Sequence, residues 1–351
     1  MDSKQVIDSR PASVSGIYFW KKIFENGKIH RELFSAKSGV QDYQEMFKEY
    51  VAVVNIETFN FCNRKCNYCP VSFLSQRHGK IQHMSDGIYH QIISDLQLID
   101  YSEKLSFNLY NEPLASKKNL YSKLEYARTY LPNARLIFNS NGDYLDIEAL
   151  DNLAKIGVTS INITLQTKGE YIHLDKQKEL KAFYSKLKKN LEITSDVSDK
   201  HIKSHFYHNR LRVDVSCINY DEFGHSRSGA IEYLKVKEKR NYPCARPFRE
   251  LTIFHDGFVY PCCNIMSDLD PDKKMAIGHI SQCESIYSLF ASKMLQSFRR
   301  DLFSFGIKKS PCDDCSERFC TTNDNDRGIR DEILESIEGD NKLIKFTPFI
   351  S

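Results

Sequence analysis

Residues 61–70 read FCNRKCNYCP and place Cys62, Cys66 and Cys69 in a CX3CX2C pattern, directly after the apolar run VAVVNIE at residues 51–57. Three thiolates this close together in one loop can bind three irons of a 4Fe–4S cluster and leave its fourth iron without a protein ligand. A structural zinc or cluster site normally uses four protein ligands. The lack of a fourth cysteine nearby therefore favours an iron site with an open position, with a zinc site or a chance spacing as the alternative.

From Val51 onward, short β-branched and aromatic runs alternate with segments of helical periodicity. The expected strands are residues 51–57, 104–110, 135–140, 160–165 and 211–217, and the expected helices are residues 85–97, 116–131, 146–156 and 179–194. Such alternation implies βαβ units and a parallel sheet. Five or six repeats are too few for a closed (β/α)8 barrel, so the pattern predicts an α/β fold with a partial (β/α)6 TIM-like barrel.

The boundaries of these segments have their own signals. Ser85, Ser116 and Asp146 precede expected helices and can accept hydrogen bonds from the free N–H groups of the first turn. The polar residues 195–210 are expected to form a connection, and the alternating rhythm ends near residue 240. We therefore expect an N-terminal extension over residues 1–50, the barrel over 51–240, a smaller cysteine-rich module over 241–330 and a tail over 331–351.

The second group of cysteines lies in that smaller module. Cys244 and Cys262 flank the dipeptide DG at residues 256–257 and give the spacing CX12GX4C, and Cys312 and Cys315 form a CX2C pair. The DG dipeptide between two apolar runs predicts a β-hairpin with a two-residue turn. Four cysteines can thus converge on a second site, which fits either an iron–sulfur cluster or a structural zinc ion.

With Tyr68 just before its last cysteine, the CX3CX2C motif resembles the signature of the radical S-adenosylmethionine (SAM) superfamily, over roughly residues 50–330. The resemblance implies that Cys62, Cys66 and Cys69 hold a 4Fe–4S cluster whose open iron chelates SAM. It also implies that an electron from a flavodoxin- or ferredoxin-type donor cleaves SAM to a 5′-deoxyadenosyl radical, which takes a hydrogen atom from the substrate.

Further motifs resemble the SAM-binding segments of this superfamily. Residues 110–113 (YNEP) are similar to its GGEP motif, with Tyr-Asn in place of Gly-Gly, and a carboxylate and carbonyls at the end of a strand suit the SAM ammonium group. The third expected strand ends in residues 139–142 (NSNG), and the fourth ends in residues 162–167 (NITLQT). Gln166 stands at the position where relatives usually have an acidic residue. An ordinary turn is the alternative for 139–142. The resemblance implies a SAM site formed by Tyr68, Asn111, Glu112, Pro113, Ser140, Asn141, Thr164 and Gln166.

The second cysteine group resembles the SPASM and Twitch modules that accompany radical SAM barrels. Because the cysteines after Cys315 are too few for two four-ligand sites, we expect one auxiliary 4Fe–4S cluster. Its expected ligands are Cys244, Cys262, Cys312 and Cys315. Cys263 and Cys320 are alternative ligands.

Two further residues are candidates for contact with the substrate. Arg227 lies in the segment HSRSG, seventeen residues before Cys244, a spacing similar to that of a Twitch-bearing cyclitol dehydrogenase whose arginine contacts substrate. A guanidinium can hold vicinal hydroxyls or a carboxylate. Cys217 ends an expected strand, where a thiol could face the substrate. A surface ion pair for Arg227 and a core position for Cys217 are the alternatives.

Composition narrows the partners and the compartment. The net charge of +3, from 49 basic and 46 acidic residues, indicates neither nucleic acid nor an anionic membrane as a partner. The N-terminus has no apolar segment typical of a signal peptide, and no stretch is long enough to span a bilayer. Eleven cysteines then indicate metal binding in the reducing cytoplasm rather than disulfides.

These features favour the oxidation, or a redox-linked rearrangement, of a small polar metabolite such as a sugar, an aminocyclitol or a nucleoside-like molecule. The alternative is the crosslinking or epimerisation of a ribosomally made peptide, a common reaction of SPASM and Twitch enzymes. Such enzymes often carry a leader-binding domain for which residues 1–50 are expected to be too short. Epimerisation would also need a hydrogen donor, for which Cys217 is the candidate.

Overall fold

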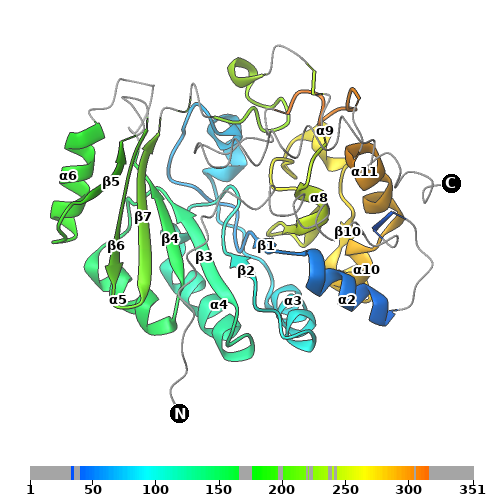
Figure 1. The fold of residues 1–351 in the computed structure, drawn as a ribbon, viewed down its shortest axis with the longest axis horizontal. Coiled ribbons are helices and arrows are strands. Elements are labelled where there is room, and N and C mark those ends of the chain that lie inside the picture. The colour runs from blue at the N-terminus through cyan, green and yellow to red at the C-terminus, as the bar shows by residue number, and fades with distance from the viewer. Residues whose placement is uncertain are drawn as a thin grey trace, which may run out of the picture.

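The computed structural model describes residues 33–34, 40–165, 176–196, 201–218, 220, 224–235, 239–240, 243–303 and 306–315. The described strands are β1 (Val53–Ile56), β2 (Lys104–Ser106), β3 (Arg135–Ser140), β4 (Ser160–Thr164), β5 (Ile193–Asp196), β6 (His201–His208), β7 (Leu211–Ile218), β8 (Glu250–Ile253), β9 (Phe258–Tyr260) and β10 (Gly278–His279). They form one sheet in the order β10-β9-β8-β1-β2-β3-β4-β7-β6-β5 (Figure 1).

The central six of these strands are parallel. Neighbouring pairs from β8 through β1, β2, β3 and β4 to β7 all run in the same direction. The remaining strands pair antiparallel at the two edges of the sheet. The predicted partial (β/α)6 barrel is therefore confirmed, and its sixth parallel strand comes from residues 250–253, after the alternating pattern of the sequence has ended.

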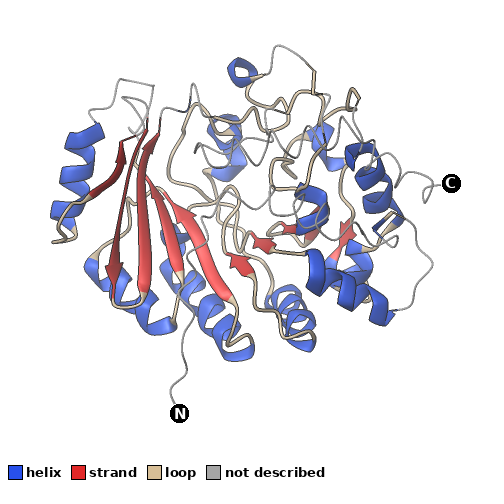
Figure 2. Ribbon diagram, viewed as in Figure 1, coloured by secondary structure: helices blue, strands red, loops and turns tan. Residues whose placement is uncertain are grey.

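Helices cover one face of this sheet (Figure 2). The described α-helices longer than one turn are α2 (Val40–Tyr50), α3 (Asp86–Leu98), α4 (Lys117–Tyr130), α5 (Ile147–Ile156), α6 (Lys176–Lys186), α10 (Ile286–Phe290) and α11 (Lys293–Phe303). Two of the predicted N-caps are confirmed, because Ser85 accepts from the N–H of Ile88 and Asp146 accepts from that of Ala149. Ser116 makes no side-chain capping bond.

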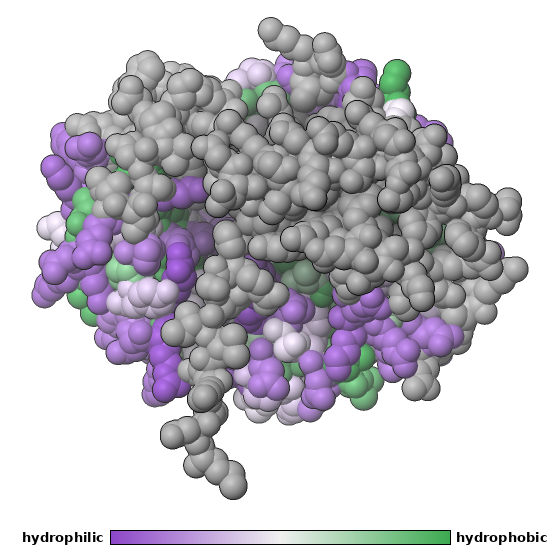
Figure 3. Space-filling model, in the orientation of Figure 1, coloured by the Kyte–Doolittle hydropathy of each residue, from purple (hydrophilic) through white to green (hydrophobic). Residues whose placement is uncertain are grey.

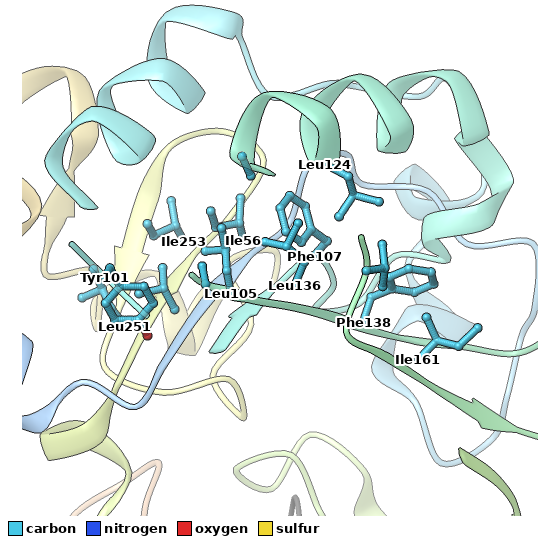
Figure 4. Close-up of a cluster of buried hydrophobic side chains, with 14 of the residues drawn as sticks. Ile56, Tyr101, Leu105, Phe107, Leu124, Leu136, Phe138, Ile161, Leu251 and Ile253 are labelled. Atoms are coloured by element: carbon cyan, nitrogen blue, oxygen red, sulfur yellow. The ribbon is translucent and has the colours of Figure 1, made fainter. Parts of the chain in front are cut away.

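The main core lies between the sheet and these helices. Because side chains alternate along a strand, one face of each parallel strand is apolar and the other is polar. Figure 4 shows Leu136, Phe138 and Ile161 pointing from the sheet toward Leu124 of α4. On the opposite face Asn55 donates from Nδ2 to Glu250 Oε2, at 3.2 Å. The concave face of the partial barrel is thus lined with polar groups.

The expectation of a polar connection over residues 195–210 is wrong. Residues 201–208 form β6, which pairs antiparallel with β7 along its whole length, and β5 pairs with β6 in turn. Alternate apolar residues, Ile202 and Phe206, are buried against the core, and this two-residue period was hidden among histidines and lysines. The hairpin therefore extends the sheet beyond β7.

The hairpin predicted at residues 256–257 is confirmed. β8 and β9 pair antiparallel around it, and Gly257 has a φ of +89°, a conformation that residues with a Cβ disfavour.

The helix α2 lies in the expected N-terminal extension, where we had predicted no element, and it packs against α10. Among the described helices none is both long and apolar enough to cross a membrane. Figure 3 shows mainly hydrophilic side chains on the visible surface of the described residues.

Candidate active site

The three cysteines of the CX3CX2C motif lie in the loop that follows β1. The N–H of Cys69 donates to the carbonyl of Cys66 at 3.0 Å, so the loop folds back on itself. Burial, helped by the nearby Glu112, Cys69 and Cys66, raises the pKa of the Cys62 thiol to about 12. Burial also raises the pKa of Cys69. Thiolates that are buried and repel each other need a cationic partner, so this loop fits an iron cluster.

A buried ion network holds this loop against the C-terminal region. Arg77 is fully buried, and its Nη1 donates to Glu57 Oε1 at 2.6 Å. Its Nε donates to Asp268 Oδ2 at 2.8 Å, across 191 positions of sequence. The carbonyl of Arg77 also accepts from the N–H of Cys62. No motif in the sequence marked Arg77, because its partners lie so far away along the chain.

The YNEP segment lies at the end of β2, where Glu112 connects it to the end of β3. Its carboxylate accepts from the N–H groups of Leu114 and Asn141 and from the hydroxyl of Ser140, at 2.7–3.1 Å. Burial raises the pKa of Glu112, although these hydrogen bonds oppose the shift. The structure thus brings Glu112, Ser140 and Asn141 together, and the carboxylate already accepts hydrogen bonds from the chain itself.

Asn111 is the neighbour of Glu112 and retains an unused donor. It is 7% exposed, its Oδ1 accepts from the N–H of Leu109, and its Nδ2 has no hydrogen-bond partner within the described residues. Buried polar groups of folded proteins are nearly always hydrogen-bonded. An amide donor of this kind fits a bound ligand such as SAM at the end of β2.

The loop after β3 contacts the cysteine loop through a second ion pair. Arg64, between Cys62 and Cys66, forms a bidentate pair with Asp143 at 2.7–2.9 Å. Nδ2 of Asn141 also donates to Oδ1 of Asn63, at 2.9 Å. A cavity of about 300 Å³ opens beside these residues; it is lined by Arg64, Asn141, Gly142, Asp143, Leu165, Glu179, Ala182, Phe183 and Lys186. The cysteine loop is therefore positioned from both sides, by Arg77 and by Arg64.

The aromatic residue of the motif has a partner that the sequence did not indicate. The ring of Tyr68 stacks on Tyr220, with centroids 3.9 Å apart and an angle of 7° between the planes. The side chain of Tyr220 is hydrogen-bonded to Thr164 at the end of β4. Tyr220 therefore lies between Tyr68 and Thr164: its ring stacks on the first, and its side chain is hydrogen-bonded to the second. Gln166 lies outside the described residues.

The predicted auxiliary ligands lie around one cavity. It is small, with a volume of about 10 Å³, and is lined by Ser228, Arg240, Cys244, Arg246, Pro247, Cys262, Asn264, Phe298, Leu302, Cys312 and Cys315. No three cysteine, histidine or carboxylate groups in the described part of the chain converge on a point that could hold one metal ion. A zinc ion needs its sulfurs at about 2.3 Å. The structure therefore brings the four predicted ligands of the second site to one cavity without showing the close convergence that one zinc ion requires.

Cys263, one of the two alternative ligands, does not line this cavity. The Sγ of Cys263 accepts from Nη1 of Arg246 at 3.2 Å, and its carbonyl accepts from the Tyr110 hydroxyl at 3.0 Å. Cys263 therefore belongs to the boundary between the two cysteine sites. Cys320 lies outside the described residues.

Arg227 lies in the region between the two cysteine sites. It is partly buried, and its guanidinium carbon is 5.7 Å from the centre of the Tyr110 ring. Burial raises the pKa of Cys69, and Arg227 is close enough to oppose that rise. The φ angles of Arg227 and Ser228 are +50° and +55°, which costs free energy in a residue with a Cβ. The Ser226 hydroxyl holds this strained turn by donating to the Asp314 carbonyl at 2.8 Å.

Cys217 lies apart from these residues. It is 0% exposed and belongs to the main core, on the same face of β7 as Val213 and Val215. The polar side chains of the barrel, such as Ser216, lie on the opposite face. The structure therefore does not bring Cys217 together with the other predicted site residues.

Comparison with known proteins agrees with this arrangement. Residues 56–206 match the model of the radical SAM superfamily, and residues 244–316 match that of the SPASM iron–sulfur cluster-binding domain. The S-adenosyl-L-methionine-dependent 2-deoxy-scyllo-inosamine dehydrogenase of Niallia circulans is 25% identical over 266 residues, which cover 76% of this chain and 92% of that protein.

Solved structures show the same fold. BtrN in complex with AdoMet and 2-DOIA has a TM-score of 0.55 and 22% identity, and BtrN in an open conformation has a TM-score of 0.52; each match covers 78% of this chain and 95% of BtrN. The chain belongs to the radical SAM superfamily: it is an enzyme whose cofactors are SAM and 4Fe–4S clusters, with a SPASM-type cluster-binding domain in its C-terminal region.

Proposed function

We propose that this enzyme catalyses the two-electron oxidation of a small polar metabolite, an aminocyclitol or a related sugar. The observation that carries the proposal is the position of Arg227 between the two cysteine sites, beside Tyr110 and within reach of Cys69. The dehydrogenase of Niallia circulans, which by its name acts on 2-deoxy-scyllo-inosamine, supports the substrate class. The substrate would be held where a radical can reach its carbon and an auxiliary cluster can take its electron.

The chemistry of Arg227 fits hydroxyl groups of such a substrate. A guanidinium has only donors, in a planar fork, and so suits the oxygens of vicinal hydroxyls. Tyr110 replaces a glycine of the family motif and contributes a large ring beneath this cation, which leaves less room than glycine would. A compact ring with several hydroxyls fits this position better than a peptide segment does.

We propose the following assignment of cofactor ligands. Cys62, Cys66 and Cys69 hold the cluster that binds SAM, and Cys244, Cys262, Cys312 and Cys315 hold one auxiliary 4Fe–4S cluster, which their shared cavity supports. When bound, these groups supply reductive cleavage of SAM and an acceptor for one electron. The proposed contacts to SAM are made by Tyr68, Asn111, Glu112, Pro113, Ser140, Asn141, Thr164 and Gln166.

The net reaction balances as an alcohol oxidation. SAM and its cluster, held by Cys62, Cys66 and Cys69, would supply the acceptor for the C–H hydrogen. The auxiliary cluster, held by Cys244, Cys262, Cys312 and Cys315, would accept the remaining electron, and the hydroxyl proton would leave to solvent. Arg227 would orient the hydroxyls so that the C–H bond to be broken faces the bound SAM. The free thiols that cluster assembly requires agree with the reducing cytoplasm as the compartment.

The test is anaerobic reconstitution followed by assay with SAM, dithionite and a panel of aminocyclitols, sugars and short peptides. We expect about eight irons per chain, 5′-deoxyadenosine as a product, and a substrate product that has lost two hydrogens. A triple Cys62→Ala, Cys66→Ala, Cys69→Ala variant should make no 5′-deoxyadenosine. If that variant still cleaves SAM, or if only a peptide is modified, the proposal is wrong.

The role of Arg227 has its own comparison. Arg227→Gln should lower turnover of the substrate at least tenfold, because the charged fork is lost, while uncoupled SAM cleavage continues. Arg210→Gln, at the exposed turn between β6 and β7, is the matched control and should leave turnover unchanged. Equal turnover in both variants would remove Arg227 from the substrate site.

The proposed electron donor is an acidic protein of the flavodoxin or ferredoxin type. Residues 58–85, which contain the CX3CX2C loop, include no Asp or Glu, and Lys65, Phe73 and Lys80 are exposed, Phe73 to 56%. Exposed basic side chains and an exposed aromatic ring, in a segment without acidic residues, suit an acidic partner. Lys65→Glu with Lys80→Glu should slow SAM cleavage driven by flavodoxin but not by dithionite. Lys155→Glu, at the end of α5, is the control, and equal effects on both reductants would refute this docking surface.

A further inference from the structure

Asn264 follows the auxiliary cysteines in the loop after β9 and has an unused donor. Its side chain is 1% exposed and lines the four-cysteine cavity. Within the described residues its Nδ2 has no hydrogen-bond partner, whereas its backbone N–H donates to the Sγ of Cys262 at 3.3 Å. A buried amide donor without an acceptor is unfavourable, so its position beside the thiols calls for an explanation.

Arg227 determines the orientation of this amide. Nη1 of Arg227 donates to Oδ1 of Asn264 at 3.0 Å. Because a guanidinium has no acceptor, the oxygen of Asn264 must face Arg227, and Nδ2 must point the other way within the amide plane, on the opposite side of the Cβ–Cγ bond. The turn that carries Arg227 is held in turn by Asp314, between Cys312 and Cys315. The donor is therefore fixed by groups that belong to the same cysteine site.

We infer that Nδ2 of Asn264 donates a hydrogen bond to a sulfur of the auxiliary cluster and raises its reduction potential, with Arg227 as the positioning residue. This inference rests on the proposed function, in which the four cysteines hold that cluster. Hydrogen bonds to the sulfurs stabilise the more negative, reduced state and shift the potential upward. A higher potential favours transfer of the substrate electron to this cluster. Asn264 would thus set the driving force of the oxidation.

The test uses the Cys62→Ala, Cys66→Ala, Cys69→Ala background, in which the auxiliary cluster is the only one. A redox titration followed by electron paramagnetic resonance gives its midpoint potential. Asn264→Leu, of similar size but without a donor, should shift the midpoint to more negative values. Arg227→Gln should shift it in the same direction by a smaller amount, because the amide is no longer held. Ser267→Ala, a buried polar residue in the same loop, should leave the midpoint unchanged.

A second measurement does not depend on any variant at position 264. Protein labelled with ¹⁵N in asparagine side chains should show a ¹⁵N coupling to the reduced auxiliary cluster by pulsed electron paramagnetic resonance. An absent coupling, or an unchanged midpoint in Asn264→Leu at equal iron and sulfide content, overturns the inference and leaves the proposed function intact. A background protein that binds zinc or no iron overturns both, because the cluster itself would then be missing.

Discussion

The buried pair between Arg77 and Glu57 allows a quantitative prediction. Both side chains are 0% exposed, their charged atoms are 2.6 Å apart, and Asp268 contacts the same guanidinium. Replacing Arg77 with Met leaves the Glu57 carboxylate buried without its main cation. Removal of one partner from a buried pair costs about 3–5 kcal/mol. An unfolding entropy of about 2.1 cal/mol/K per residue over 351 residues corresponds to about 1.4 °C per kcal/mol, so the melting temperature should fall by about 4–7 °C.

The assay is thermal unfolding of the reconstituted protein, followed anaerobically by circular dichroism. Lys117→Met is the matched control, because Lys117 and Asp146 form a pair that is 34% and 51% exposed and such pairs contribute about 0–1 kcal/mol. The double variant Arg77→Met, Glu57→Gln should recover part of the loss, since it removes the unpaired charge. Equal shifts for Arg77→Met and Lys117→Met would refute the reasoning.

The same pair predicts a dependence on pH. Burial works to raise the pKa of Glu57, but Arg77 and His255 outweigh it and hold that pKa below its usual value. Its contribution to stability is therefore present above the unfolded pKa of about 4.3 and is lost as the pH falls through the lower folded value. In Arg77→Met, that cation no longer opposes the effect of burial on the pKa of Glu57. The difference in melting temperature between the unmodified protein and Arg77→Met should therefore be largest at neutral pH and should narrow toward a pH of about 4.

Three further predictions concern single residues. Glu112→Ala should lower the free energy of unfolding by roughly 2 kcal/mol or more, because it leaves three donors without their acceptor. Ser140→Ala should lower it by only about 1 kcal/mol, because only one of these hydrogen bonds is lost. Urea titration measures both losses, and equal losses would contradict the prediction. Gly257→Ala should cost about 1–3 kcal/mol in the same titration, because its φ is +89° and a Cβ would lie 2.8 Å from His279; an unchanged midpoint would argue against the turn. Cys217→Ser should leave substrate turnover unchanged, because Cys217 faces the core. Accumulation of a substrate radical in this variant during the turnover assay would instead favour the epimerase alternative.

Local patterns in the sequence were sufficient for much of the barrel. The strand predicted over 135–140 coincides with β3, and Ser85 and Asp146 act as caps, because these signals depend on neighbours a few residues away. Ser116 makes no capping bond because a short 3-10 helix, Pro113–Ser116, precedes α4 directly. The side chain of Glu112 caps that helix by accepting from the N–H of Leu114, which sequence spacing does not reveal. The antiparallel strand β6 was missed because polar side chains on its exposed face concealed the alternation.

The sequence by itself determined the chemistry of this protein, since the spacing of Cys62, Cys66 and Cys69 sets the ligands that one loop can offer a metal cluster. Only the tertiary structure decided which distant segments meet: it paired β8 with β1, connected Arg77 to Asp268 and placed Arg227 beside Tyr110 and Asn264. The physical reason is that ligand spacing is encoded within one short segment. Contacts across many residues depend on sheet order and on the packing of the whole core, which no local pattern specifies.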